Sequence, residues 1–275
     1  MEALAGATAL VTGASGGIGA HIARRLAREG ANVALVARRE EQLEAVAAEV
    51  RSLGTRAEPV PADLTRREAI DSVVERAEAA LGPIDLLVNN AGVETTAAFT
   101  RITAEELVRV VELNLTAPLL LTHRVVPAML ERRRGHVVFI ASLAGKFGPA
   151  YQEPYAATKG ALVHLTQSLR AEFVDAPVGF SVVCPGFVAG DGMYQRMVDE
   201  GIRSNRLMGE TTTERVAERV VEAIRRDIPE VIESGAPIRP LLALGELAPR
   251  VLERAAGRVG VTRLFRAVAA QRGRV

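Results

Sequence analysis

Apolar residues in this 275-residue chain form short, nearly continuous runs that alternate with longer amphipathic stretches. Short apolar runs bounded by polar or glycine-rich segments are typical of strands buried on both faces of a sheet. The pattern predicts seven strands, of which the last is the weakest: Ala7–Val11, Val33–Ala37, Arg56–Val60, Ile84–Val88, Gly135–Ala141, Gly179–Val183 and Glu230–Ile232. Helices are expected between them, at residues 17–29, 39–53, 66–81, 104–113, 115–133, 154–175 and 212–226.

The alternation of strands and helices predicts an α/β fold with a doubly wound parallel sheet of about seven strands, Rossmann-like, with helices on both faces and right-handed crossovers. Ligands of such sheets bind beyond the carboxyl ends of the strands. Polar and glycine-rich clusters follow the predicted strand ends: Thr12–Gly19, Ala37–Arg39, Asp63, Asn89–Gly92, Ser142 and Pro185-Gly186. We expect one catalytic domain over residues 1–236, including a lid at about 187–210, and a helical C-terminal extension over 237–275.

The first strand runs into Thr12-Gly-Ala-Ser-Gly-Gly-Ile-Gly19, a loop with four glycines that opens the first helix. Glycine allows a tight turn and a close backbone approach to a pyrophosphate, and the helix start offers free N–H groups to phosphate oxygens. A plain strand-to-helix turn needs one or two glycines. The loop therefore predicts dinucleotide binding by Gly13, Ser15, Gly17, Ile18 and Gly19.

The second strand ends in Ala37-Arg38-Arg39. A site that prefers NAD usually has an acidic residue here for the ribose 2′-hydroxyl, whereas an arginine suits the 2′-phosphate of NADP. Ala37 leaves the acidic position empty. The sequence therefore favours NADP(H), with NAD(H) possible, and Arg38 ahead of Arg39 as the phosphate ligand; the alternative is that both arginines are solvated charges at a helix start.

Tyr155 and Lys159 are four residues apart on a predicted helix, so their side chains share one face, and Ser142 lies thirteen residues upstream. A phenol has a pKa of about 10, which a neighbouring cation lowers. The chain has only two lysines, Lys146 and Lys159, among its 34 basic residues. A lysine where this chain otherwise has arginine indicates a need for a compact ammonium. The three residues predict a proton-transfer site.

Together these motifs resemble the short-chain dehydrogenase/reductase family, over roughly residues 5–235. The resemblance rests on their order: Thr12–Gly19, Asp63-Leu64, Asn89-Asn-Ala-Gly92, Asn114, Ser142, Tyr155-x-x-x-Lys159 and Pro185-Gly186. It implies that Tyr155 is the general acid in ketone reduction, and that Lys159 binds the nicotinamide ribose and depresses the Tyr155 pKa. It further implies that Ser142 polarises the substrate carbonyl, and that Asn114, at a break in its helix, holds a water that links Lys159 to solvent.

The resemblance also implies the remaining cofactor contacts. Asp63 is expected to bind the adenine amino group, and Leu64 to supply a backbone contact. Asn90, Ala91 and Gly92 would line the adenine-ribose stretch, and Pro185, Gly186 and Val188 would flank the nicotinamide. The family commonly has threonine four residues after that last glycine, where this chain has Gly190. Because that threonine would bond the nicotinamide carboxamide, the group that anchors the carboxamide in this chain is left open.

Composition limits the other roles. The net charge of +1 argues against nucleic-acid binding by the whole molecule, and no uncharged apolar run approaches the roughly 18 residues of a membrane span. The single cysteine, Cys184, excludes an intrachain disulfide and fits a reducing compartment, which favours the cytoplasm. No metal site is expected. The family resemblance suggests a homodimer or homotetramer.

The segments expected to touch substrate are mostly apolar, with Phe147, Tyr151, Phe187, Met193 and Tyr194 as candidates beside Ser142. The tail after Pro237 has eight arginines against two glutamates, a net charge of +6, and apolar residues at helical spacing. Such a helix can lie on an anionic membrane surface. The favoured alternative is that it packs on a partner subunit or over the substrate entrance.

The leading hypothesis is therefore an NADP-dependent oxidoreductase that interconverts a ketone and a secondary alcohol, on a lipophilic substrate such as a steroid-like, acyl-chain or aryl ketone. A second hypothesis is a 3-oxoacyl-thioester reductase, for which the basic tail would serve as a docking surface. A hypothesis of another class is a non-catalytic NADP-binding sensor or scaffold. The complete Ser142, Tyr155 and Lys159 set argues against that third reading.

Overall fold

A computed structural model describes residues 4–205 and 208–275, apart from the side chain of Leu252. Its main sheet has seven strands, all parallel, in the order β3-β2-β1-β4-β5-β6-β9. The strands are β1 Thr8–Thr12, β2 Asn32–Ala37, β3 Ala57–Pro61, β4 Leu86–Asn89, β5 Gly135–Ile140, β6 Val178–Pro185 and β9 Glu230–Glu233. The predicted doubly wound, Rossmann-like sheet is confirmed, and every predicted strand is present to within two residues at its ends.

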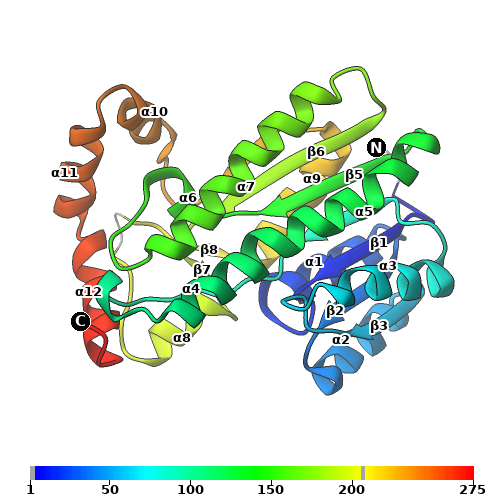
Figure 1. Ribbon diagram of the computed structural model, residues 1–275, viewed down its shortest axis with the longest axis horizontal. Helices are drawn as coiled ribbons and strands as arrows, with labels where there is room; N and C mark the ends of the chain where they lie inside the picture. The colour runs from blue at the N-terminus through cyan, green and yellow to red at the C-terminus, as the bar shows by residue number, and fades with distance from the viewer. Residues whose placement is uncertain (1–3, 206–207) are drawn as a thin grey trace.

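Helices cover both faces of this sheet (Figure 1). Those that connect its strands are α1 Gly17–Arg28, α2 Glu40–Ser52, α3 Glu68–Leu81, α4 Ala104–Val111, α5 Ala117–Glu131, α7 Glu153–Glu172 and α9 Thr213–Arg226. Several short elements were not predicted, because they are too short to show a period: α6 Ala144–Phe147, β7 Val188–Ala189, α8 Met193–Asp199, β8 Thr211–Thr212 and the 3-10 turn Phe99–Arg101. Most of them belong to loops that follow strand ends.

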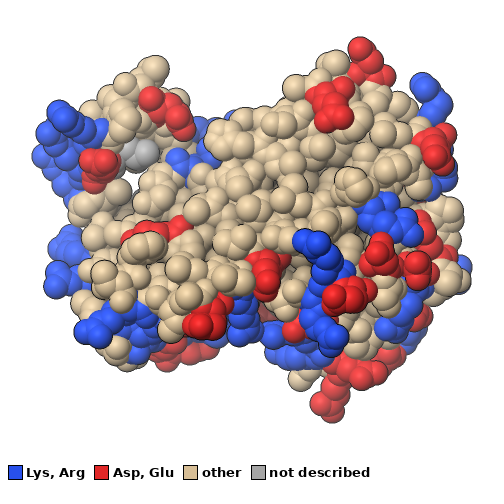
Figure 2. Space-filling view, viewed as in Figure 1, with Lys and Arg blue, Asp and Glu red and all other residues tan. Residues whose placement is uncertain are grey.

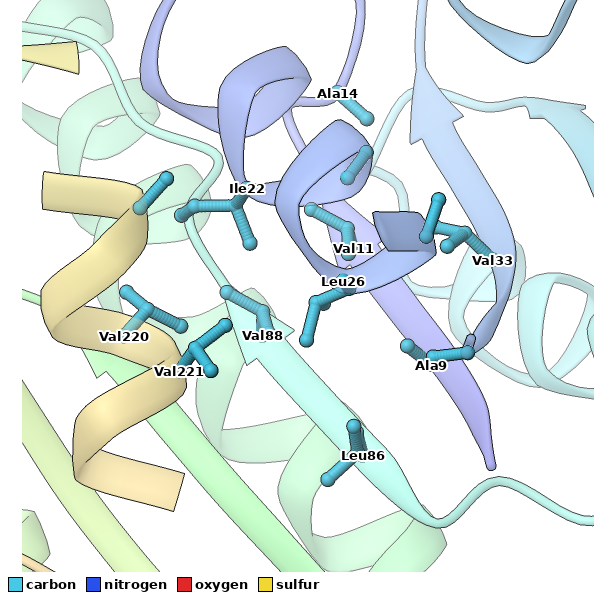
Figure 3. Packing of buried hydrophobic residues seen from close by; sticks show 14 of the residues in the cluster. Ala9, Val11, Ala14, Ile22, Leu26, Val33, Leu86, Val88, Val220 and Val221 are labelled. Carbon is cyan, nitrogen blue, oxygen red and sulfur yellow. The ribbon is translucent and has the colours of Figure 1, made fainter. Parts of the chain in front are cut away.

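Two apolar layers hold the sheet between its helices. On one face, α1, α2 and α9 pack against the central strands, with Ile22, Leu26 and Val220 fully buried (Figure 3). On the other face, α3, α5 and α7 form the second layer, in which Phe139 and Phe180 are the largest buried side chains. Because the core strands are buried on both faces, their sequences are continuous apolar runs. The two layers fix the strand ends at which the polar clusters lie.

The chain beyond the last strand forms three helices, α10 Arg239–Leu247, α11 Pro249–Val259 and α12 Val261–Gln271, which confirms the predicted C-terminal helical extension. They lie together at one end of the molecule, with α12 beside α8 (Figure 1). Within the described residues, no helix is both long and apolar enough to cross a bilayer. Residues 1–3 of the expected domain and residues 206 and 207 of the expected lid lie outside the described part of the chain.

His136 on β5 is a buried titratable group remote from the motif residues. Burial lowers its pKa from 6.5 to about 4, and its Nε2 atom is 2.8 Å from the Ser181 hydroxyl oxygen. A histidine buried in its neutral form must take up a proton as the protein unfolds in acid. We therefore expect the free energy of unfolding to fall as the pH drops from 6.5 to 4, by roughly 3 kcal/mol from this group. Urea unfolding across that range measures the loss.

Other groups also titrate in this pH range, so the contribution of His136 is measured by comparing the pH dependence of unfolding between variants. H136Q should lack this part of the pH dependence, whereas H164Q, at an exposed position, should keep the wild-type slope. Equal slopes for H136Q and wild type between pH 6.5 and 4 would contradict the assignment.

Candidate active site

A cavity of about 820 Å³ lies beyond the carboxyl ends of the parallel strands, where the predicted motifs meet. It is lined by most of the predicted cofactor and catalytic residues: Gly13, Ser15, Gly17, Ile18, Arg38, Arg39, Asp63, Leu64, Asn90, Ala91, Gly92, Ser142, Tyr155, Lys159, Pro185, Gly186 and Val188. Two predicted residues, Gly19 and Asn114, lie behind this lining. The structure thus brings together in one cavity residues that are up to 175 positions apart in sequence.

Tyr155 is the third residue of α7, where the helix begins at the cavity. Its pKa is raised to about 12, because removal of water disfavours the phenolate; a hydrogen bond with Ser142 acts in the opposite direction. The Ser142 oxygen also accepts a hydrogen bond from the Ala144 N–H at 3.1 Å, which orients the hydroxyl. Tyr155 is therefore held as a neutral phenol whose proton can be donated.

Lys159 is buried one turn further along α7, with its Nζ atom 5.7 Å from the centre of the Tyr155 ring. The ammonium donates a 2.7 Å hydrogen bond to the carbonyl oxygen of Ile140, at the end of β5. Burial lowers the Lys159 pKa to about 8. The net shift of the Tyr155 pKa is upward in this structure, because desolvation of the phenol outweighs the hydrogen bond with Ser142. A lowering of the Tyr155 pKa by Lys159 stays a prediction.

Asn114 lies on a π-helical turn, Glu112–Thr116, that joins α4 to α5. A π turn widens the helix and is frequent at functional sites. The fully buried Asn114 side chain accepts a hydrogen bond from the Val93 N–H and donates one to the Val93 carbonyl, at 2.8 and 2.9 Å. It also donates to the Thr158 hydroxyl, next to Lys159. Asn114 thus fixes the loop after β4 against α7.

The glycine loop is packed too closely for side chains at two of its positions. Gly13 has a φ of +68°, which favours glycine, and a Cβ on Gly19 would lie 2.3 Å from the Gly13 carbonyl oxygen. Gly19 therefore contributes by letting the loop close on itself rather than by facing the cavity. Asn90 reinforces the closure, since its side-chain amide donates to the Thr12 carbonyl at 2.8 Å.

The start of α1 already holds an anionic oxygen. The Gly17 N–H donates a 2.7 Å hydrogen bond to a carboxylate oxygen of Asp191, which comes from the loop after β7. This carboxylate stands in for an anion at the helix N-terminus, where the dipole favours negative charge. The loop's chemistry and spacing therefore fit a phosphate group at this position.

Arg38 and Arg39 are both exposed and both line the cavity next to the glycine loop. The Arg39 guanidinium donates a 3.1 Å hydrogen bond to the Ser15 hydroxyl. Burial acts to raise the pKa of the Asp63 carboxyl, but hydrogen bonds from Thr65 and the positive charge of Arg38 lower it, and the net shift is downward. Arg38 therefore lies close to Asp63. The two arginines thus place two guanidinium groups at one end of the cavity.

The last of the predicted cofactor residues lie at and just after the end of β6. Pro185, Gly186 and Val188 line the cavity there, and Val188 pairs with Thr211 in the short β7–β8 ladder. Gly190, where the resembling family commonly has threonine, has a φ of +112°. That backbone conformation is strained for any residue with a side chain, so it accounts for the glycine at this position.

The predicted substrate residues gather on the same side, with one exception. Phe147, Phe187, Met193 and Tyr194 line the cavity, whereas Tyr151 does not. Tyr151 is half-buried and, like Phe147 and Phe187, packs against an apolar cluster that contains Tyr194 and buried residues of α12. The Tyr194 hydroxyl hydrogen-bonds to Ser204 and Glu210, which leaves its ring to face apolar neighbours.

Residues 7–200 match the sequence pattern of the family described as short chain dehydrogenase. The chain belongs to the short-chain dehydrogenase family. Members of this family are oxidoreductases, and all the motifs that suggested the resemblance lie within the matched range. The family assignment made from the sequence is therefore confirmed.

Individual relatives agree with this assignment. The chain is 39% identical to a protein named ketoacyl reductase HetN from Nostoc sp. (strain PCC 7120), over 92% of this chain and 89% of that protein. It is 31% identical to a Drosophila melanogaster protein named dehydrogenase/reductase SDR family protein 7-like, over 90% and 78%. A solved metagenomic short-chain oxidoreductase, in complex with NADP, is 36% identical and superposes with a TM-score of 0.71, covering 84% of this chain and 98% of that one.

This short-chain dehydrogenase also has cavity residues that the sequence did not reveal. Glu94 and Gln152 line the cavity near Tyr155, and the Glu94 charge acts to raise the Tyr155 pKa. Glu94 accepts a hydrogen bond from Thr96 and forms a 3.1 Å ion pair with Arg272 of the tail. Proximity to Gly92 and Tyr155 in sequence was a weak signal for Glu94 and Gln152. For Arg272 the only signal was the expectation that the tail packs over the substrate entrance or on a partner subunit, which did not single out this arginine.

Proposed function

We propose that this chain is an NADP-dependent oxidoreductase that interconverts a ketone and a secondary alcohol, with an apolar substrate. The observation that carries the proposal is the arrangement around Tyr155, whose protonated phenol, bonded to Ser142 and backed by Lys159, faces the same cavity as the glycine loop. A solved relative bound to NADP and a relative named ketoacyl reductase support the same reading. The apolar side chains of Phe147, Phe187 and Met193 support an apolar substrate.

In this proposal the residues of the chain bind, polarise and protonate the carbonyl. Ser142 turns its single O–H from the Tyr155 oxygen to the carbonyl oxygen and donates a hydrogen bond to it, while its own oxygen accepts from the Ala144 N–H. Tyr155 then breaks its O–H bond and gives the proton to the oxygen that becomes the alcohol. Lys159 stabilises the resulting phenolate through its charge. In the reverse direction Tyr155 takes up the proton of the alcohol.

The glycine loop and the α1 N-terminus would hold the cofactor diphosphate, and Arg38, Arg39 and Ser15 would hold the 2′-phosphate. NADPH, when bound, supplies the hydride that is added to the carbonyl carbon. Asn114 would keep the Val93 loop and α7 in register beside Lys159. Asp63, Leu64 and the Asn90–Gly92 loop would line the adenosine half.

A screen of NADPH oxidation over diverse ketones tests the proposal directly. We expect several apolar ketones to be reduced with a kcat/KM within the common enzymatic range, above about 10⁴ M⁻¹s⁻¹ for the best of them. Small charged ketones should be poor substrates, because the lining side chains of Phe147, Phe187 and Met193 give a charged group no partner. Failure to oxidise NADPH with any ketone, and to reduce NADP with the matching alcohols, would overturn the proposal.

The cofactor preference gives a separate prediction. R38D should weaken NADPH binding by about 10- to 100-fold and leave NADH binding nearly unchanged, because a charge-assisted hydrogen bond to the 2′-phosphate is worth about 1.5–3 kcal/mol. R39D tests the neighbouring arginine, which in this structure is bonded to Ser15. Titration of each variant with both cofactors, followed by fluorescence, measures the two dissociation constants.

R28D is the matched control, since Arg28 is exposed at the far end of α1. It introduces the same change of charge away from the cavity and should alter neither constant by more than about twofold. If R38D and R39D weaken NADPH and NADH equally, neither arginine binds the 2′-phosphate.

A 3-oxoacyl-thioester reductase is the second candidate, and the relative named ketoacyl reductase favours it. An acidic carrier or coenzyme would need a basic surface near the cavity, and the arginines of α11 lie at the edge of the molecule (Figure 2). Comparison of a 3-oxoacyl thioester with its simple ester distinguishes the two candidates. A thioester reductase should prefer the carrier-linked form by at least tenfold, and should lose that preference in high salt.

We also propose that the chain forms a homodimer or homotetramer. The face made by α4, α5 and α7 is largely uncharged across its middle (Figure 2). Val108, Val111 and Leu119 are exposed large hydrophobic residues of α4 and α5. Sedimentation equilibrium measures the mass, and a charged substitution such as V108E should shift it toward the monomer.

A further inference from the structure

We propose that the C-terminal helices form part of the substrate site, as an apolar wall that selects a carbonyl compound with a large uncharged body. This inference deepens the proposed function and rests on it for the identity of the reacting group. It concerns residues 237–275, which lie outside the range 7–200 that matches the family pattern.

The first observation is that the tail lines the cavity with apolar side chains. Ile238 and Leu241 lie at the start of α10, Ala256 and Val259 on α11, and Val261 and Phe265 on α12. No charged residue beyond position 237 contributes to the described lining, although the tail has eight arginines. Burying an unpaired carboxylate or phosphate against such a wall is costly, whereas burying apolar surface is favourable.

The second observation is that the tail and the lid pack as one apolar unit. Val261, Leu264, Phe265 and Val268 of α12 are buried together with Tyr194 and Met197 of α8. The Phe187 ring lies between the two, with its centre 6.2 Å from that of Phe265 and 5.1 Å from that of Tyr194. Because Phe187 directly follows Pro185-Gly186, this unit begins beside the predicted nicotinamide position.

The third observation is that polar contacts fasten the end of the tail to the catalytic domain. Arg272 bridges two carboxylates, Glu94 at 3.1 Å and Glu200 at 3.2 Å, and the Glu94 side chain is only 7% exposed. Arg274 pairs with Glu106, and its carbonyl accepts a 2.8 Å hydrogen bond from the Ala98 N–H. A buried carboxylate that loses its cation is strongly disfavoured, so these contacts hold the wall in place.

The wall is tested by filling it at one position. In V259W an indole ring replaces a small aliphatic side chain that lines the cavity from α11, whereas V251W makes the same change at a position of α11 that is 39% exposed and outside the lining. Two ketone pairs share a reacting group and differ in apolar size: butanone with methyl nonyl ketone, and cyclohexanone with decalone. The linear and fused-ring pairs distinguish an acyl-chain body from a steroid-like one.

For V259W we expect the ratio of kcat/KM for the large ketone over the small one to fall by at least tenfold, because the indole displaces several methylenes of the large ketone from the wall and their burial is lost. V251W should keep the wild-type ratio within twofold. V259A, which cannot clash, should weaken binding of methyl nonyl ketone by about fivefold through lost contacts. Thermal unfolding of each variant checks that the fold is kept.

A direct binding measurement separates this inference from the proposed function. The dissociation constant of methyl nonyl ketone, measured by calorimetry, should rise at least tenfold in V259W and not in V251W. If the dissociation constants change as expected but no ketone is reduced, the proposed reaction is wrong and the proposed apolar wall is supported. If wild type does not bind the ketone, or if V259W and V251W behave alike in both assays, the wall is overturned.

Discussion

Replacing Tyr155 with phenylalanine is expected to lower kcat for ketone reduction by about a thousandfold or more while leaving the dissociation constant of NADPH within threefold. The reason is that the ring fills the same space but has no proton to give, and general acid catalysis contributes about 10²- to 10⁴-fold. The Tyr155 pKa of about 12 means that wild type holds this proton firmly until a substrate oxygen accepts it. Steady-state kinetics and cofactor titration measure the two quantities.

Y151F is the matched control, because Tyr151 lies nearby but does not line the cavity. It should keep most of the wild-type kcat. Y155F activity above about one tenth of wild type would remove Tyr155 from the proposed mechanism. The same variant addresses the sensor hypothesis: if Y155F binds NADPH and retains the full biological effect of the chain, then turnover is not its function.

The second large effect is expected at Lys159, where activity and stability should change in opposite directions. K159M should lower kcat/KM by at least about a hundredfold, because the phenolate of Tyr155 loses its neighbouring cation. It should also raise the free energy of unfolding at neutral pH. Lys159 is buried, and no carboxylate pairs with it among the ion pairs of the described residues, so its ammonium is desolvated with little compensation.

The sign and the pH range of this stability change follow from the lowered pKa. The Lys159 pKa falls from 10.5 to about 8 on folding, so below pH 8 the folded chain bears the full cost of the buried charge. That cost is roughly 3 kcal/mol, reduced by the hydrogen bond to Ile140 that methionine cannot make. The advantage of K159M should therefore be largest below pH 8 and fade toward pH 10.5.

K146M provides the contrast, since Lys146 forms a 2.8 Å ion pair with Glu230. Removing a cation that has a partner should give no gain in stability. Urea unfolding of the two variants at pH 7 and pH 10 measures both effects. An equal gain for K146M and K159M, or a gain for K159M that does not depend on pH, would contradict the argument that Lys159 is held at an electrostatic cost.

The positions of Arg38 and Arg39 were predictable from the sequence, but their side-chain contacts were not. The position after β2 is recognisable from the strand pattern, because strand ends and ligands of parallel sheets coincide. Which arginine turns toward Ser15 depends on the first turn of α2, and the structure gives that contact to Arg39. The Tyr155 pKa shows the same limit: the helical spacing from Lys159 was readable in the sequence, but the desolvation that raises this pKa was not.

The order of apolar runs and loop motifs by itself determined the parallel sheet, the glycine loop and the neighbouring positions of Tyr155 and Lys159, because each depends on residues close together in the chain. The tertiary structure alone decided that Glu94 meets Arg272, 178 positions away, and that Val259 and Phe265 join Phe187 in one cavity. Those contacts depend on how α10–α12 return across the lid, and a local apolar or basic pattern is compatible with many partners. The reaction class is thus readable from residues 12–186, whereas the substrate wall exists only in the folded chain.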